Sequence, residues 1–164
     1  MNSLNKMKIH LIPVSIGEKE ILSNLIQEYQ KEIFKQEKIG EYKYLDSYWQ
    51  EPNRHPYFIK VDDEIVGFVL VNKYSLVEKE ANSISEFYIK KESRNKGIGK
   101  QSAFKTFDLF PGKWEIRELD DNVPAQGFWR KVINEYTNGD FKEVILNNRE
   151  WRGPTQIFDN NDLS

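Results

Sequence analysis

The feature that most restricts the fold of this chain is a strand that leads, through a short glycine-containing turn, directly into a helix. Residues 84–90 are mostly apolar, β-branched or aromatic and predict a strand, while residues 98–110 carry apolar side chains at helical spacing. A helix that begins at such a turn presents free backbone N–H groups and the positive end of its dipole. Gly97 and Gly99 lack a Cβ atom, so a ligand can lie against the backbone. The segment predicts a phosphate site, although a helix start that merely contains two glycines is the simpler interpretation of so short a motif.

Two well-known phosphate motifs do not fit this segment. A Walker A loop that ends at Lys100 would need glycine in place of Arg94 and serine or threonine in place of Gln101. A dinucleotide-binding fingerprint that begins at Gly97 would need glycine or alanine in place of Ser102. The sequence therefore disfavours a nucleotide triphosphatase and a dehydrogenase.

A third motif does fit. The pattern Arg94-x-x-Gly97-x-Gly99 after an apolar strand resembles the pyrophosphate-binding motif of the GNAT superfamily, the acyl-CoA-dependent N-acyltransferases. The turn from Arg94 to Lys100 is then expected to hold the pyrophosphate of the donor. The resemblance also implies that the backbone of the preceding strand, at residues 87–89, pairs with the pantetheine arm like an added strand.

A second segment supports the same resemblance. Asn122-x-x-Ala125-x-x-Phe128-Trp129 is similar to the superfamily's Asn-x-x-Ala-x-x-Phe/Leu-Tyr pattern, and a predicted strand at 114–119 lies between the two motifs. Trp129 departs from the pattern, because many relatives carry a catalytic tyrosine there. An indole N–H donates a hydrogen bond but does not serve as an acid. The group that protonates the departing thiolate is therefore left unassigned.

The order of predicted elements implies a mixed sheet. Strands are predicted at 8–14, 57–61, 65–72, 83–90, 114–119, 141–146 and 155–158, and helical stretches at about 18–33, 45–49, 98–110 and 124–137. The first of these helices is expected to bury an apolar stripe of Ile21, Leu22, Leu25, Ile26, Tyr29 and Ile33. We expect an α/β fold with a mostly antiparallel sheet of six to seven strands, flanked by about four helices. This order resembles the complete GNAT fold. We expect one domain over residues 1–164, with loose termini at 1–7 and 159–164.

Composition excludes several classes of protein. The net charge of −2 gives no basic excess for nucleic acid or an anionic membrane, and the absence of cysteine excludes disulfides and thiolate chemistry. With only His10 and His55, a histidine-rich metal site is not expected. The most apolar run, residues 65–71, is too short to span a bilayer. We expect a cytoplasmic protein, monomeric or homodimeric, without a metal.

The resemblance implies a set of donor-binding residues for acetyl-CoA as co-substrate. They are Phe87, Tyr88, Ile89, Arg94, Asn95, Lys96, Gly97, Ile98, Gly99, Lys100, Asn122, Phe128 and Trp129. Two of them have a purely structural alternative, because Asn122 can be a helix cap and Phe128 is a core residue whatever the function.

Glu86 is the candidate general base, since relatives often place a carboxylate on this strand near the acceptor; the alternative is a glutamate that faces solvent. Residues 41–58 are expected to line the acceptor pocket, where Tyr44 and Tyr48 can receive a cationic amine through cation–π contacts. The alternative for this region is an aromatic stripe that packs on the sheet.

The resulting hypothesis is an N-acetyltransferase that acts on a small-molecule or peptide amine. Two alternatives remain open: a non-catalytic acyl-CoA-binding or regulatory module, which Trp129 suggests, and a generic α/β domain whose turn binds another phosphate ligand. The sequence does not identify the acceptor amine or the length of the acyl group.

Overall fold

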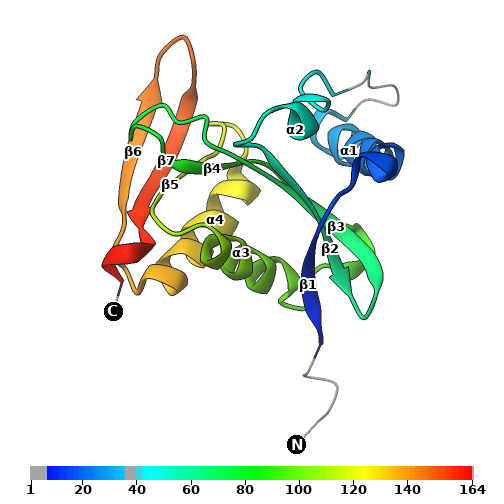
Figure 1. The fold of residues 1–164 in the computed structure, drawn as a ribbon. Helices are drawn as coiled ribbons and strands as arrows, with labels where there is room; N and C mark the ends of the chain where they lie inside the picture. The colour runs from blue at the N-terminus through cyan, green and yellow to red at the C-terminus, as the bar shows by residue number, and fades with distance from the viewer. Residues whose placement is uncertain (1–6, 36–39, 41, 164) are drawn as a thin grey trace, which may run out of the picture. The chain divides into compact units, whose positions relative to one another are not determined.

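The computed structural model describes residues 7–35, 40 and 42–163 (Figure 1). The chain forms two compact units, each of which is discontinuous in sequence. The first contains residues 1–71 and 85–102, and the second contains residues 72–84 and 103–164. Strand β4 and helix α3 both run from one unit into the other, so each unit is described by itself below.

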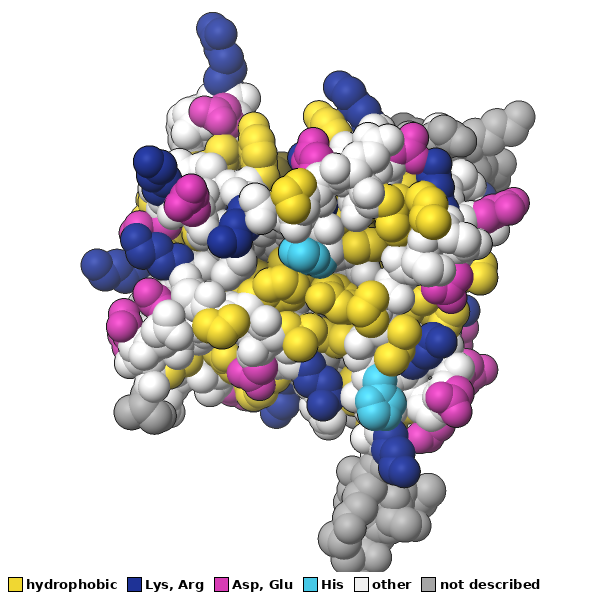
Figure 2. Space-filling model, in the orientation of Figure 1, with side chains coloured by type: hydrophobic (Ala, Val, Ile, Leu, Met, Phe, Trp, Pro, Cys, Tyr) yellow, Lys and Arg dark blue, Asp and Glu magenta, His cyan; other side chains and the backbone are white. Residues whose placement is uncertain are grey.

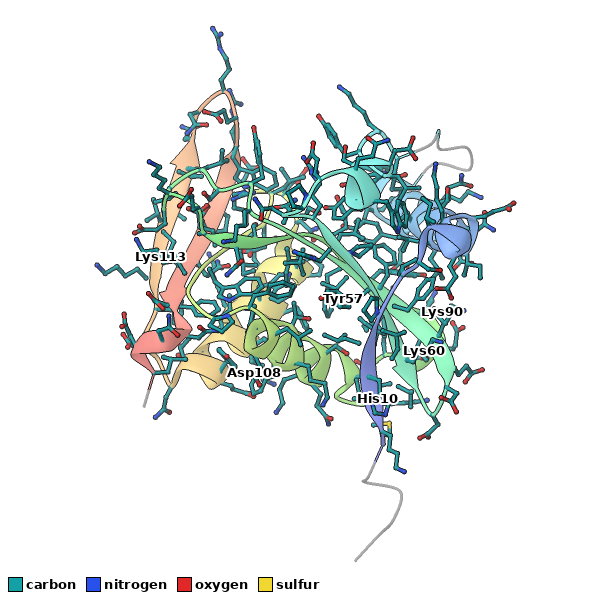
Figure 3. The ribbon with its side chains drawn as sticks, in the orientation of Figure 1. His10, Tyr57, Lys60, Lys90, Asp108 and Lys113 are labelled. Carbon is teal, nitrogen blue, oxygen red and sulfur yellow. The ribbon has the colours of Figure 1, made fainter. Side chains whose placement is uncertain are left out.

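The first unit is built from an antiparallel hairpin, two helices and the end of β4. Its elements are β1 (Ile9–Pro13), α1 (Lys19–Phe34), α2 (Ser47–Gln50), β2 (His55–Val61), β3 (Glu64–Asn72) and the second half of β4 (Asn82–Ile89). The hairpin turn is Asp62-Asp63, where both residues have positive φ and Val61 pairs with Glu64, as in a two-residue turn that follows the strand twist. His10 of β1 lies beside Lys60 of β2 (Figure 3).

Apolar side chains of the first unit form one buried cluster on each face of the strands. Neighbours in sequence, such as Phe58 and Ile59 or Tyr88 and Ile89, belong to different clusters because successive strand side chains point to opposite faces. The cluster that includes α1 contains Val14, Leu22, Leu25, Ile26, Leu45, Tyr48, Phe58, Phe68, Leu70 and Tyr88. The other cluster contains Ile9, Ile59, Val66, Ile89 and Ile98.

Gly67 is required by the close approach of β3 to β4. A Cβ atom at this position would lie 2.0 Å from the carbonyl oxygen of Tyr88, which is backbone and cannot move aside cheaply. The register of β2 on β3 shifts between Ile59 and Lys60, opposite this glycine. The shift and the glycine together fix the part of β4 that contains Tyr88.

The second unit packs the body of α3 (Ile98–Leu109) and α4 on three strands. These elements are β5 (Lys113–Arg117), α4 (Val123–Thr137), β6 (Lys142–Asn147) and β7 (Arg152–Asp159). The centre is aromatic: the Phe107 ring lies 5.0 Å from both the Trp114 and the Phe158 rings, in edge-on arrangements. Asn138, with positive φ, ends α4 as the sequence predicts.

The seven strands follow the order β1-β2-β3-β4-β5-β7-β6, and β4 pairs with β5 in parallel. The predicted α/β fold with a mostly antiparallel sheet of six to seven strands and about four helices is confirmed. The parallel ladder pairs Asn82 with Trp114 and Ser83 with Glu115, so residues 87–89 lie beyond the pairs that it contains. In the described part of the chain, no helix is long and apolar enough to cross a membrane.

Two expectations about packing and order need correction. The apolar stripe of α1 is narrower than its sequence suggests, because Ile21 and Ile33 are 48% and 38% exposed. The C-terminal segment is not loose: residues 160–162 form a 3-10 turn, and the Asn160 side chain accepts a hydrogen bond from Gly112 N and donates one to Phe107 O, each at 2.8 Å. These bonds satisfy backbone groups in the last turn of α3 and just after it, and sequence patterns do not report such long-range partners. Residues 1–6 and 164 of the termini predicted to be loose lie outside the described residues.

Candidate active site

Glu86 of β4 is a half-buried carboxylate next to a phenol from α1. Tyr29 is close enough that the Glu86 charge helps to raise the pKa of its phenol. Burial disfavours the charged form and raises the pKa of Glu86 to about 7, and the Tyr29 contact opposes only part of this effect. A carboxylate with such a pKa exchanges a proton readily at neutral pH, as a general base must.

Tyr48 and Tyr44 occupy different environments in the segment predicted to line the acceptor pocket. Tyr48 is 3% exposed, and its hydroxyl lies 2.6 Å from Ser85 Oγ, which borders Glu86 on β4. Tyr44 is 48% exposed. The Arg54 guanidinium lies over both rings, 5.8 Å from the Tyr44 centroid and 5.5 Å from the Tyr48 centroid. These rings therefore already hold a cation of the chain itself. Residue 41, the first of this segment, lies outside the described residues.

The turn after β4 has the backbone geometry that the glycine pattern indicates. Strand β4 ends at Ile89, and Lys90 is the first residue after it (Figure 3). Asn95 and Gly97 both have left-handed backbone, with φ of 63° and 81°. Asn95, Lys96 and Gly97 are exposed, and α3 begins at Ile98. The first N–H groups of a helix have no partner within the helix, so an anion at this turn would meet backbone donors.

Side chains of the predicted donor set differ in what they can offer a ligand. Ile98 is 3% exposed and Ile89 is 8% exposed, and both pack in one apolar cluster, so only their backbone groups are available for binding. Tyr88 is equally buried, on the opposite face. Gly99 is half-buried, whereas Lys100 is exposed.

Arg94, the first residue of the motif, is directed at helix α1. Its Nη1 and Nη2 donate to the two carboxylate oxygens of Glu32 at 2.6 and 2.8 Å, and its Nε donates to the Ile89 carbonyl at 2.9 Å. The guanidinium also lies over the Tyr88 ring, 5.6 Å from its centroid. The side chain is thus engaged at all three nitrogens within the first unit.

The predicted residues of the second motif lie on α4, in the second unit. Asn122 caps this helix, because its Oδ1 accepts a hydrogen bond from Ala125 N at 3.2 Å. Trp129 is 7% exposed and packs beside the Phe107 and Phe128 rings, with centroids 6.3 and 4.9 Å away. Asn122 therefore has the structural role that the sequence offered as its alternative, whereas Phe128 is half-buried and is not among the buried core residues. Contact of these residues with pantetheine stays a prediction.

The first unit brings Glu86, Tyr88 and Arg94 together with two residues that the sequence did not assign to a site. Tyr29 and Glu32 are separated by three positions on α1 and therefore share a helix face. The apolar stripe of α1 included Tyr29 as a core residue, and nothing local marked its hydroxyl as a partner of Glu86. The available signal was the spacing of Tyr29 and Glu32, three residues apart, which places both on one face of the helix.

The second unit contains another buried carboxyl that the sequence did not indicate. Glu118 follows β5 and is 3% exposed; its Oε1 accepts a hydrogen bond from Gln156 Nε2 at 2.9 Å. Burial raises the pKa of Glu118 to about 8, and the nearby Glu143 carboxylate adds to the effect. Glu143 in turn forms a bidentate ion pair with Arg130.

Charged side chains of both signs are intermixed over the face seen in Figure 2, which agrees with a net charge close to zero. Among the described residues, no group of three or more histidine, aspartate or glutamate side chains is placed to hold a metal ion.

Proteins of known structure share this fold. Among the solved structures that match, three examples align over most of both chains. An acetyltransferase from Thermus thermophilus is 16% identical, with a TM-score of 0.68 over 93% of this chain and 97% of that one. The PaiA N-acetyltransferase of Thermoplasma acidophilum, solved in complex with coenzyme A, is 14% identical, with a TM-score of 0.65 over 93% and 99%. A dodecameric spermidine N-acetyltransferase from Vibrio cholerae is 12% identical, with a TM-score of 0.61 over 92% and 93%.

At these identities the structural likeness shows the fold alone. None of the curated proteins compared with this sequence matches it. The acetyltransferase (GNAT) family model matches residues 22–133, which include most of α1, the β4 strand with its turn, and most of α4. This match covers more than half of the chain. The protein therefore belongs to the GNAT acetyltransferase family.

Proposed function

We propose that this protein transfers an acetyl group from acetyl-CoA to a primary amine of a small molecule or peptide, by direct attack in a ternary complex. The observation that carries the proposal is Glu86, a half-buried carboxylate whose pKa of about 7 suits a general base, on the strand that leads into the glycine turn. Family membership supports an acyl-CoA donor.

The amine must lose a proton before it attacks. An alkyl amine with a pKa of about 10.4 is mostly protonated at neutral pH. Glu86 takes this proton, directly or through water, and the amine nitrogen then attacks the carbonyl carbon of the thioester. The attacking nitrogen of the tetrahedral intermediate gives up its second proton to solvent, the oxyanion collapses as the C–S bond breaks, and CoA leaves as thiolate. A thiol with a pKa of about 8.5 is acidic enough to leave without an enzyme acid, so Trp129 is compatible with turnover.

The donor is held by backbone groups more than by side chains in this proposal. The left-handed Gly97 opens the turn to the pyrophosphate, and the N–H groups at the start of α3 bind it. Residues 87–89 lie beyond the pairs of the β4–β5 ladder, so their backbone is suited to pair with an extended pantetheine arm. A backbone N–H of this segment can stabilise the oxyanion.

A second candidate function is a non-catalytic acyl-CoA-binding module. Trp129 favours it, because it stands where many relatives carry a catalytic tyrosine and is buried among aromatic rings. Both candidates share the donor site and differ only in turnover.

Two measurements test these functions in sequence. Thermal unfolding is followed with acetyl-CoA, CoA, ATP or NAD present; a rise in Tm selective for the CoA compounds supports both candidates, and no response to CoA compounds removes both. Thiol release from acetyl-CoA is then measured against a panel of amines, with Glu86→Gln as the matched inactive variant. Amine-dependent release that this variant lacks supports the enzyme, and CoA binding without release supports the module.

A further inference from the structure

Arg94, in the turn after β4, forms an ion pair with Glu32 of helix α1. Both guanidinium Nη atoms donate to the two carboxylate oxygens of Glu32, which fixes the relative orientation of the two side chains. The Arg94 side chain is 34% exposed and that of Glu32 is 44% exposed. Most exposed ion pairs contribute little to stability, but a bidentate arginine–carboxylate pair such as this one is an exception, so it can fix α1 against the turn.

A series of contacts runs from this ion pair to the face of β4 that carries Glu86. The Arg94 guanidinium lies over the Tyr88 ring, and the Tyr88 ring packs against Tyr29 with centroids 5.7 Å apart. Glu86 lies two residues before Tyr88 on β4 and so shares its face of the strand, where its charge helps to raise the pKa of the Tyr29 phenol. Because Tyr29 and Glu32 share one face of α1, the same helix face meets both the base and the motif arginine.

Electrostatics oppose a direct role of Arg94 in phosphate binding. The Arg94 contact lowers the pKa of Glu32, so Glu32 is an anion at neutral pH. A pyrophosphate that took the guanidinium would displace this carboxylate from both of its hydrogen bonds and leave two anions side by side. Binding of the pyrophosphate by the backbone N–H groups of the turn displaces no carboxylate.

We propose that Arg94 is a positioning residue: with Glu32 it fixes the end of α1 against β4 and so holds Tyr29 beside the Glu86 carboxylate, while the turn's backbone meets the phosphates. This inference rests on the proposed function, in which Glu86 is the base. Within the motif, the glycine turn then binds the donor, and the arginine positions the base.

The groups around Glu86 make the proposal measurable. Tyr29 faces it from α1, and Tyr42 faces it from the segment before α2. Burial and the Glu86 charge raise the pKa of both phenols above their ordinary value, so neither titrates near neutral pH. Glu86 is therefore the member of this group whose proton is exchanged near pH 7.

The test compares Arg94→Gln, Arg94→Lys and Glu32→Gln with acetyl-CoA and with acetyl-pantetheine, a donor that lacks the pyrophosphate. Loosening α1 admits water to Glu86. We expect all three variants to lose roughly tenfold in kcat with both donors and to keep KM for acetyl-CoA within about twofold. The acid limb of the rate profile should move below pH 7, because hydration lowers the Glu86 pKa. Lys96→Gln, in the exposed turn, is the reference for donor binding. It should raise KM for acetyl-CoA and leave the kinetics with acetyl-pantetheine unchanged.

A phosphate-binding Arg94 gives the opposite pattern. Arg94→Gln would then raise KM for acetyl-CoA alone, Arg94→Lys would retain wild-type KM since lysine binds phosphate as a point charge, and Glu32→Gln would leave kcat unchanged. That pattern overturns the proposal. The pKa of the Glu86 carboxyl, measured by ¹³C NMR, needs no turnover: a fall in all three folded variants supports positioning even in an inactive protein, and an unchanged value overturns it. Absence of turnover in the wild type would count against the proposed function alone.

Discussion

Replacing Glu86 by glutamine should remove activity and at the same time stabilise the protein. Burial raises the pKa of Glu86 from its ordinary value of 4.5 to about 7, so the folded protein holds this proton more tightly than the unfolded chain. Each pH unit of difference is worth about 1.4 kcal/mol, so the ionised carboxylate costs the folded state about 3 kcal/mol at pH above 7. Glutamine has nearly the same shape and no charge.

The sign of this effect depends on pH. Below pH 4.5 Glu86 is protonated in both folded and unfolded states, so Glu86→Gln should leave the free energy of unfolding unchanged. As the pH rises from 4.5 to about 7, the wild type loses stability that the variant keeps. Above pH 7 the difference is constant, at up to about 3 kcal/mol in favour of the variant.

Urea denaturation at pH 5 and pH 8 measures this difference, and thiol release from acetyl-CoA at pH 8 measures the loss of activity. Glu64→Gln is the matched control, because Glu64 is an exposed glutamate on the neighbouring strand β3, and it should change neither quantity. A Glu86→Gln protein that is no more stable than the wild type at pH 8, or less stable, would refute the assignment of a desolvated carboxylate. Full activity with an unchanged pH profile would refute its role as base.

Three further predictions concern the donor turn and the second unit. Gly97→Val should reduce acetyl-CoA affinity at least about tenfold and cost about 1–2 kcal/mol of stability, because φ is 81° at this residue; calorimetric titration of the folded variant showing wild-type affinity would contradict the turn's role. Trp129→Phe should retain most of kcat, whereas Trp129→Ala should lower the free energy of unfolding by about 3–5 kcal/mol through lost packing; a well-folded Trp129→Phe protein without turnover would show that the indole N–H is needed. Glu118→Gln should raise stability at pH 9 but not at pH 4, since burial raises the pKa of Glu118 to about 8; denaturant midpoints that shift equally at both pH values would contradict this account.

Local sequence patterns were enough for the framework of the fold. Apolar runs at 57–61 and 65–72 predicted the strands β2 and β3, and helical spacing over 124–137 predicted α4. Two short motifs in the right order predicted the family, which the family model confirms. These features are visible in sequence because each is set by residues within one or two turns of the chain.

The roles of individual side chains depended on contacts between distant segments. The sequence placed Arg94 at the donor and Tyr29 in the core, yet the structure joins Arg94 to Glu32 across 62 positions and brings Tyr29 next to Glu86. The raised pKa of Glu86 is likewise a property of burial, which no local pattern encodes. The sequence alone therefore determined the elements, their order and the glycine turn, because backbone propensity is local. Only the tertiary structure decided which carboxylate is desolvated and which arginine is already engaged, because desolvation and ion pairing arise where segments remote in sequence pack together.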